Sequence, residues 1–237
     1  MKAMILAAGL GTRFKPWTDH HPKALALVNG KSLLERNIHY LQLCGIYNVL
    51  VNVHHFAGQI VDAIHLNNGW GSKITISDET GEVLETGGGL KKAAAYFNDG
   101  PFVLLNADIL TDMNLNAMIA FHEVSKPLVT LAVTDRKSSR YFLFDKKERL
   151  SGWRNTKTGE EIISLPAREL HEKAFSGIHF ISPEIFPLMQ GNGKFSIVDV
   201  YLELAVSYSI LGFDHSGTKL VDVGTKESLA VAESLFA

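Results

Sequence analysis

The sequence has a single cysteine, almost no surplus of charge and no long apolar run. Cys44 has no second cysteine with which to form an internal disulfide, which is typical of a reducing compartment. The 23 Lys and Arg residues nearly balance the 25 Asp and Glu residues, which argues against a dedicated nucleic-acid binder. No stretch approaches the roughly 18 apolar residues of a membrane helix, and residues 1–9 are too short for a signal-peptide core. We therefore expect a cytoplasmic protein with neither a nucleic-acid nor a membrane partner.

The composition is that of an ordinary globular protein. Hydrophobic residues make up 46% and charged residues 20% of the 237 residues, which excludes a disordered tail, a fibrous repeat and a coiled coil. This length favours one large α/β domain with a core that can hold a concave active site.

Apolar runs and helical patterns alternate through the first 133 residues. Strands are expected at residues 4–6, 49–53, 74–76, 102–105 and 128–133. Helices are expected at residues 32–45, 59–66, 90–96 and 115–124, the first of them with a capping box formed by Ser32 and Glu35. This order predicts a mixed, mostly parallel central sheet flanked by helices on both faces.

The alternation breaks after Val133. Residues 135–170 are charged and contain strand-like pieces, which predicts a β-rich insertion placed to cover a pocket. Beyond it we expect a strand at 175–181, a helix at 198–208, a strand at 219–221 and a helix at 226–236.

The residues that follow the strands matter most, because ligands of open α/β sheets bind beyond the carboxyl ends of the strands. Gly9 and Gly11 follow the first strand, and Arg13 and Lys23 add positive charge nearby. Glycines free backbone N–H groups to face an anion, so this segment suits a triphosphate. The spacing fits neither a Walker loop nor a dinucleotide fingerprint, in which a third glycine would stand at the position of Phe14.

Three later segments complete the pattern. Residues 85–89 (Glu-Thr-Gly-Gly-Gly) are expected to form a loop ahead of a helix that lets the backbone approach a flat or bulky ligand. Asp108 and Asp222 each end a strand, where capping is the alternative role of such a residue. If the fold brings them together they form a two-carboxylate site for Mg²⁺. A phosphate-binding loop, cations and a metal serve the transfer of a phosphorus group.

These segments occur in a fixed order and spacing: residues 3–13, Pro22-Lys23, 85–89, 106–108, 175–178 and 221–225. The combination covers nearly the whole chain and resembles the sugar-1-phosphate nucleotidyltransferases. It looks most like short bacterial members that make UDP-N-acetylmuramic acid from the α-1-phosphate, with short mannose-1-phosphate guanylyltransferase-like members close by. The resemblance implies a single domain of the Rossmann-like nucleotide-diphospho-sugar transferase fold. Residues 1–133 would be its nucleotide-binding half, and residues 134–237 its sugar-binding and closing half.

The resemblance also implies roles for individual residues. Catalysis would fall to Arg13, Lys23, Asp108 and Asp222, of which the two aspartates would hold Mg²⁺. The nucleotide-binding positions would be Leu6, Ala8, Gly9, Gly11, Thr12, Arg13, Lys23, Glu82, Gly87 and Asn106. Sugar-binding positions would be Ser176 and Gly177, with Tyr141 and Asp199 as further candidates.

The chain departs from the family pattern at Ala107, where the family usually has a glycine, and at two places that bear on the sugar. Residues 153–157 lack the Glu-Lys-Pro stretch whose lysine grips the sugar phosphate, so Arg154 or Lys157 either replaces it or is a solvated surface charge. Tyr141 stands before Phe142, where the muramic-acid-type enzymes have an aspartate.

The substrate pair is the finest level of the expectation. The best expected pair is UTP with N-acetylmuramic acid 1-phosphate or a related hexose 1-phosphate. Open alternatives are GTP with mannose 1-phosphate, cytidylyl transfer to choline phosphate or another small phosphate, and a non-catalytic nucleotide-sugar sensor subunit. We expect a monomer or a homodimer.

Overall fold

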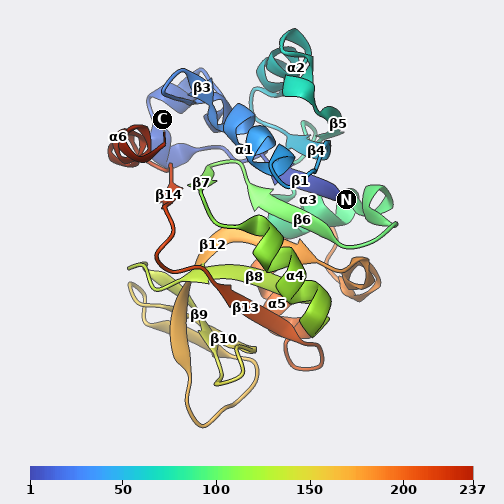
Figure 1. Ribbon diagram of the computed structural model, residues 1–237, viewed down its shortest axis with the longest axis vertical. Helices are drawn as coiled ribbons and strands as arrows, with labels where there is room; N and C mark the ends of the chain where they lie inside the picture. The colour runs from blue at the N-terminus through green and yellow to red at the C-terminus, as the bar shows by residue number, and fades with distance from the viewer. Residues whose placement is uncertain (237) are drawn as a thin grey trace.

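The fold is organised around one mixed sheet. The computed structural model describes residues 1–236, and ten strands of this part of the chain form the sheet (Figure 1). Four of them run parallel in the order β6-β1-β4-β5. They span Phe102–Asn106 (β6), Lys2–Leu6 (β1), Asn48–Val53 (β4) and Lys73–Asp78 (β5). Val, Ile and Leu are frequent in these strands because helices cover both faces of this part of the sheet.

Antiparallel strands extend the sheet beyond β6. The long strand β12 (His171–Ile181) pairs with β6, β8 and β9, and β13 lies parallel to β8. The other bounds are Val129–Thr134 (β8), Arg140–Phe144 (β9), Leu150–Asn155 (β10), Glu160–Ile163 (β11) and Ile210–Asp214 (β13). The predicted insertion is the antiparallel extension β9-β10-β11, and β10 and β13 are strands that the sequence patterns did not reveal.

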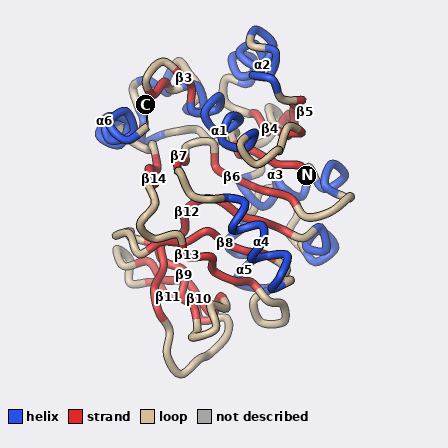
Figure 2. The backbone as a smooth tube through the Cα atoms, viewed as in Figure 1, coloured by secondary structure: helices blue, strands red, loops and turns tan. Residues whose placement is uncertain are grey.

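Helices cover the two faces of the sheet (Figure 2). Side chains of α1 (Leu33–Gln42), α2 (Ala57–Leu66) and α4 (Leu115–Ser125) pack with Ala3 and Ile5 of β1. The opposite face, which includes Met4 of β1, packs against α3 (Glu85–Lys92) and α5 (Ile197–Leu204). None of the helices in the described part of the chain has the length and apolar character that crossing a bilayer requires.

A third apolar cluster joins the two ends of the chain beside the sheet. Phe14, Val28 and Leu33 pack there with Leu110, Val221 and other residues under α6. The elements of this region are β2 (Leu27–Val28), β3 (Lys31–Ser32), β7 (Ile109–Thr111), β14 (Leu220–Asp222) and α6 (Lys226–Leu235). Short 3₁₀ helices span Thr12–Phe14, Trp17–Asp19, Lys23–Leu25, Asn68–Gly71, Ala94–Phe97 and Pro183–Leu188.

The glycine run corrects one sequence prediction. Residues 85–89 do not form a loop ahead of a helix, because α3 already begins at Glu85. A Cβ atom added to Gly88 would lie 2.1 Å from the carbonyl oxygen of Gly193, and one added to Gly87 would lie 2.5 Å from the Phe195 ring. The glycines let the helix pack directly against the backbone of residues 191–195, and this contact outweighs their low helix propensity.

This packing predicts opposite effects for two glycine substitutions. Gly88→Ala forces a methyl group into the Gly193 carbonyl, so we expect the free energy of unfolding to fall by roughly 1–3 kcal/mol. The matched control is Gly58→Ala on α2, where nothing lies within 4 Å of the added Cβ atom. Its stability should stay the same or rise by up to about 1 kcal/mol. Urea unfolding measures both, and equal effects would contradict the packing role of Gly88.

Candidate active site

A cavity of about 540 Å³ opens at the carboxyl ends of β1 and β6. Residues 6–13, which begin at the last residue of β1, form one wall, and residues 106–108, which begin at the last residue of β6, form another. Glu85 and Thr86 at the start of α3 close a third side. A cavity of this size holds a nucleotide-sized ligand. It lies at the edge of the sheet where the strand order predicts a binding site.

The loop after β1 is held by contacts on both of its sides. Gly11 adopts a φ of +62°, and its carbonyl oxygen accepts a 2.9 Å hydrogen bond from the Thr18 hydroxyl. Phe14, which follows it, is buried in the third apolar cluster. The loop is therefore fixed by its packing before any ligand binds.

Asn52 is a site residue that the sequence analysis missed. It lies on β4, is 2% exposed, and its Oδ1 accepts a 2.7 Å hydrogen bond from the backbone N–H of Ala7. Its Nδ2 donates to Glu79 at 2.8 Å, and burial raises the pKa of that carboxyl despite this hydrogen bond. One polar residue in the apolar run of β4 was the available signal, because a buried amide needs partners.

Two carboxylates and two cations meet at one side of the cavity. The Lys23 Nζ lies 2.5 Å from Asp108 Oδ2 and 4.0 Å from Asp222 Oδ1. An Arg13 Nη lies 3.9 Å from Asp222 Oδ2. The antiparallel pair β7-β14 brings the two aspartates together, since Asp222 stands opposite Ile109 and the Val223 N–H donates to the Asp108 carbonyl. We call these four residues the charged centre.

The charged centre has unused capacity for a cation. Burial and the neighbouring Asp108 carboxylate raise the pKa of Asp222, and the charges of Lys23 and Arg13 oppose that rise. Asp222 Oδ1 is buried and has no hydrogen-bond partner. Hard divalent cations prefer carboxylate oxygens and fill the remaining positions with water and phosphate oxygens. The donor set fits such an ion.

Comparison with known proteins now decides the family. A family model described as nucleotidyl transferase matches residues 2–235. The chain belongs to the nucleotidyl transferase family. An N-acetylmuramate alpha-1-phosphate uridylyltransferase of Caulobacter vibrioides is 31% identical, over 99% of this chain and 96% of its own length. The enzyme of the same name from Neisseria meningitidis is 29% identical, over 99% of this chain and 98% of its own length.

Solved structures share the fold of this nucleotidyl transferase. The crystal structure of HddC from Yersinia pseudotuberculosis complexed with GMP-PN superposes with a TM-score of 0.79 at 21% identity. The match covers 100% of this chain and 99% of that one. The prediction of a nucleotide-diphospho-sugar transferase fold is confirmed, as is the prediction of a nucleotidyltransferase enzyme.

Most predicted nucleotide-binding residues come together at the cavity. Those that line it are Leu6, Ala8, Gly9, Gly11, Thr12, Arg13, Lys23 and Asn106, together with Asp108. Two others lie outside the lining: Glu82 is exposed on the loop before α3, and Gly87 is buried under Phe195 with its N–H donated to the Phe195 carbonyl. A role for Glu82 and Gly87 at the base edge stays a prediction.

The four predicted sugar-binding residues lie apart from the cavity lining. Ser176 is fully buried, 2.8 Å from His215 Nε2, and Gly177 adopts a φ of +73° against the Asn106 side chain. The Tyr141 hydroxyl accepts a hydrogen bond from the Ser138 N–H. Asp199 is exposed in the first turn of α5. Their roles in sugar binding stay predictions.

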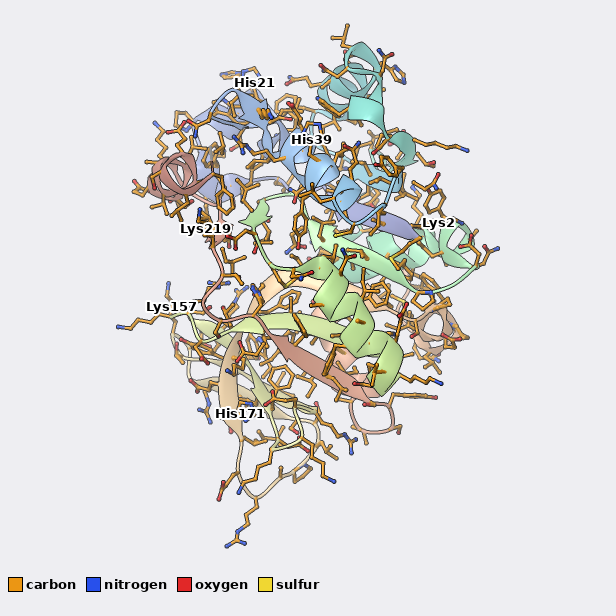
Figure 3. All side chains as sticks on the ribbon, viewed as in Figure 1. Lys2, His21, His39, Lys157, His171 and Lys219 are labelled. Carbon is orange, nitrogen blue, oxygen red and sulfur yellow. The ribbon has the colours of Figure 1, made fainter. Side chains whose placement is uncertain are left out.

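The two residues considered as substitutes for the family lysine are placed elsewhere. The guanidinium of Arg154 pairs with Glu161 on β11 and with Glu172 on β12. Figure 3 shows the exposed Lys157 side chain extending outward from the lower part of the molecule. Neither belongs to the cavity lining, and no described residue of the predicted insertion does.

The buried amide of Asn52 predicts a coupled loss of stability and nucleotide affinity. Asn52→Ala leaves the Ala7 N–H without its acceptor, which we expect to cost about 1–3 kcal/mol in unfolding free energy. The loop after β1 loses its anchor, so the Kd for a nucleoside triphosphate should rise. The control is Asn48→Ala at the exposed start of the same strand. Urea unfolding and titration calorimetry measure both quantities, and wild-type values for Asn52→Ala would contradict this assignment.

Proposed function

We propose that this enzyme transfers a nucleoside monophosphate from a nucleoside triphosphate to a sugar 1-phosphate. An oxygen of the sugar phosphate forms a bond to the α-phosphorus of the triphosphate. The bond from that phosphorus to the oxygen bridging to the β-phosphate breaks, and pyrophosphate leaves with the electron pair. The products are a nucleoside diphosphate sugar and pyrophosphate.

One observation carries the proposal: the charged centre lies beside a nucleotide-sized cavity. Both reactants are polyanions, so their mutual repulsion is the main obstacle to reaction. Arg13 and Lys23 provide positive charge at the side of the cavity where the phosphates would meet. Fixed charges of this kind stabilise a transition state with little reorganisation.

No residue is required to remove a proton in this scheme. The attacking oxygen belongs to a phosphate that is already ionised at neutral pH, so a general base has nothing to do. The contribution of the protein is to position the two phosphates in line and to neutralise them. None of the residues proposed for catalysis therefore has to act as a general base.

We assign Asp108 and Asp222 as the ligands of Mg²⁺. The buried Asp222 Oδ1, which accepts no hydrogen bond, supports this assignment. The ion, when bound, would neutralise phosphate charge and polarise the α-phosphoryl group. Lys23 forms an ion pair with Asp108, and its side chain is only 13% exposed. The lysine ammonium is therefore kept at the charged centre.

The preferred substrate pair follows from the relatives. Two relatives that share almost their full length with this chain are N-acetylmuramate alpha-1-phosphate uridylyltransferases. We therefore propose UTP and N-acetylmuramic acid 1-phosphate as the first pair to test. GTP with mannose 1-phosphate is the second, supported by 25% identity to a mannose-1-phosphate guanyltransferase of Yarrowia lipolytica, of which the chain spans 64%.

The two halves of the chain are assigned different ligands in this proposal. Residues 1–133 supply most of the cavity lining and would bind the nucleotide. Residues 134–237 supply Asp222, together with Lys194 and Gly224 of the lining, and would bind the sugar and close the site.

Pyrophosphate release tests the proposal directly. With Mg²⁺ present, four nucleoside triphosphates are combined with muramic acid, glucosamine, glucose and mannose 1-phosphates, and with choline phosphate. We expect the strongest release with UTP and N-acetylmuramic acid 1-phosphate. Nucleotide binding without release in any combination would contradict a transferase and favour a sensor subunit.

Changes in the charged centre should abolish turnover without unfolding the protein. Asp108→Asn and Lys23→Ala are each expected to lower kcat by at least about a hundredfold, the effect of removing one electrostatic group at a reacting phosphate. Removal of divalent cations with EDTA should stop the wild-type reaction. Asp62→Asn on the exposed face of α2 makes the same chemical change away from the site and should keep the wild-type rate. Near-normal turnover in Asp108→Asn would refute its role.

A further inference from the structure

The proposed reaction needs a cation for the sugar phosphate, and neither residue considered for it is free. Arg154 is committed to two glutamates, and Lys157 points into solvent. Lys23 and Arg13 already stand among the carboxylates of the charged centre. A cation on the sugar side must therefore come from another element of the structure.

Arg136 has the properties that such a residue requires. It is half-buried in the loop that joins β8 to β9, and one guanidinium Nη donates a 2.8 Å hydrogen bond to the carbonyl oxygen of Phe175. Its Nε is buried and has no hydrogen-bond partner. Within residues 1–236 no carboxylate is ion-paired with it. A half-buried guanidinium without an anion is costly to maintain.

The neighbouring carboxylates form their ion pairs with Lys173 and not with Arg136. Lys173 Nζ lies 2.6 Å from Asp135 and 2.5 Å from Asp214. Asp214 also accepts hydrogen bonds from the N–H and the hydroxyl of Ser216, and the hydroxyl oxygen of Ser216 accepts the Asp135 N–H. One ammonium offsets only one of these two carboxylates, so the cluster keeps a net charge of −1. Neither carboxylate forms an ion pair with Arg136, which leaves the guanidinium available to a ligand.

The loop that carries Arg136 is also held in place from its far side. The Tyr141 hydroxyl accepts a 2.7 Å hydrogen bond from the Ser138 N–H, and the Ser138 hydroxyl oxygen accepts the Arg140 N–H. These bonds close the loop into a tight turn at the start of β9. Tyr141 therefore helps to fix the position of the loop that carries Arg136.

A short chain of contacts links Arg136 to the charged centre. Its partner Phe175 stands two residues before Gly177, where β12 bulges. A Cβ atom added to Gly177 would lie 2.7 Å from Ile109 and 2.9 Å from Asn106. Ile109 adjoins Asp108 in the chain and stands opposite Asp222 in the β7-β14 pair. The positive charge of Arg136 also acts on Asp222. Burial and the Asp108 carboxylate raise the pKa of Asp222, and the charge of Arg136 opposes that rise.

We propose that Arg136 binds the phosphate of the sugar 1-phosphate and takes the place of the family lysine that this chain lacks. The inference rests on the proposed function and extends it to the sugar side of the site. A guanidinium can present two parallel N–H donors to a phosphate, which pairs with its charge and orients it as well. A lysine at this position supplies charge without that fork.

Kinetics of three variants test the inference. Arg136→Gln removes the charge, Arg136→Lys keeps the charge and removes the fork, and Lys137→Gln is the matched control on the exposed neighbour in the same loop. For Arg136→Gln we expect the KM for the sugar 1-phosphate to rise about 10- to 100-fold, the effect of losing a hydrogen bond between charged groups. The KM for the triphosphate and the melting temperature should stay close to wild type. For Arg136→Lys the KM for the sugar 1-phosphate should lie between the wild-type value and that of Arg136→Gln. Lys137→Gln should have the wild-type KM.

The sugar substrate separates a phosphate contact from a carboxylate contact. N-acetylmuramic acid 1-phosphate carries a carboxylate as well as its phosphate, whereas mannose and glucose 1-phosphates carry the phosphate alone. If Arg136→Gln raises KM for every sugar 1-phosphate that the wild type accepts, the phosphate assignment is supported. A loss confined to the muramic acid substrate would overturn it in favour of the carboxylate. For a wild type that accepts the muramic substrate alone, the Kd of Arg136→Gln for inorganic phosphate decides, and an unchanged Kd overturns the assignment.

The outcomes also separate this inference from the proposed function. A wild type that transfers no nucleotide to any sugar phosphate contradicts the proposed function and this inference with it. A wild type that turns over, combined with unchanged sugar-phosphate KM in Arg136→Gln, contradicts this inference alone. Equal losses for both substrates together with a lower melting temperature would show that Arg136 acts through the fold and would also overturn it.

Discussion

The repulsion between two carboxylates determines much of this structure. Asp108 lies near the middle of the chain and Asp222 near its end, and the two are held close together beside a cavity, where burial raises the free energy of an unpaired negative charge. The Lys23 ammonium lies between them and is mostly buried itself. The fold therefore has to position three ionised groups at once, and the β7-β14 pair and the third apolar cluster supply that rigidity.

The elements that align these groups could largely be predicted from the sequence. Strands such as β1, β4 and β6 are short apolar runs followed by glycine or polar residues, and such runs have few alternatives to a buried strand. The residues directly after the strands are predicted to form the ligand site because ligands of open α/β sheets bind beyond the carboxyl ends of the strands. The cavity lies at that edge.

The errors arise where tertiary contacts outweigh local preference. Strand β10 has the sequence Leu-Ser-Gly-Trp-Arg-Asn, in which no regular alternation marks a strand, and it forms because it pairs on both sides with β9 and β11. The glycines of α3 carry poor helix propensity, yet they become helical because only a residue without a side chain fits against the Gly193 carbonyl. Asn52 and Arg136 gained significance only once their partners were visible, since pairing across the fold is not encoded locally.

The β7-β14 pair makes the completeness of the charged centre depend on a late part of the chain. During synthesis the loop after β1 and Asp108 leave the ribosome long before Asp222, so the two carboxylates are brought together only when the last strand docks. Contacts between such distant residues close a large loop and form slowly compared with local structure. The assembly of the charged centre and the docking of its last strand are thus one event. A chain that has folded its parallel core but not docked β14 has most of the residues that line the cavity and lacks half of its acidic pair.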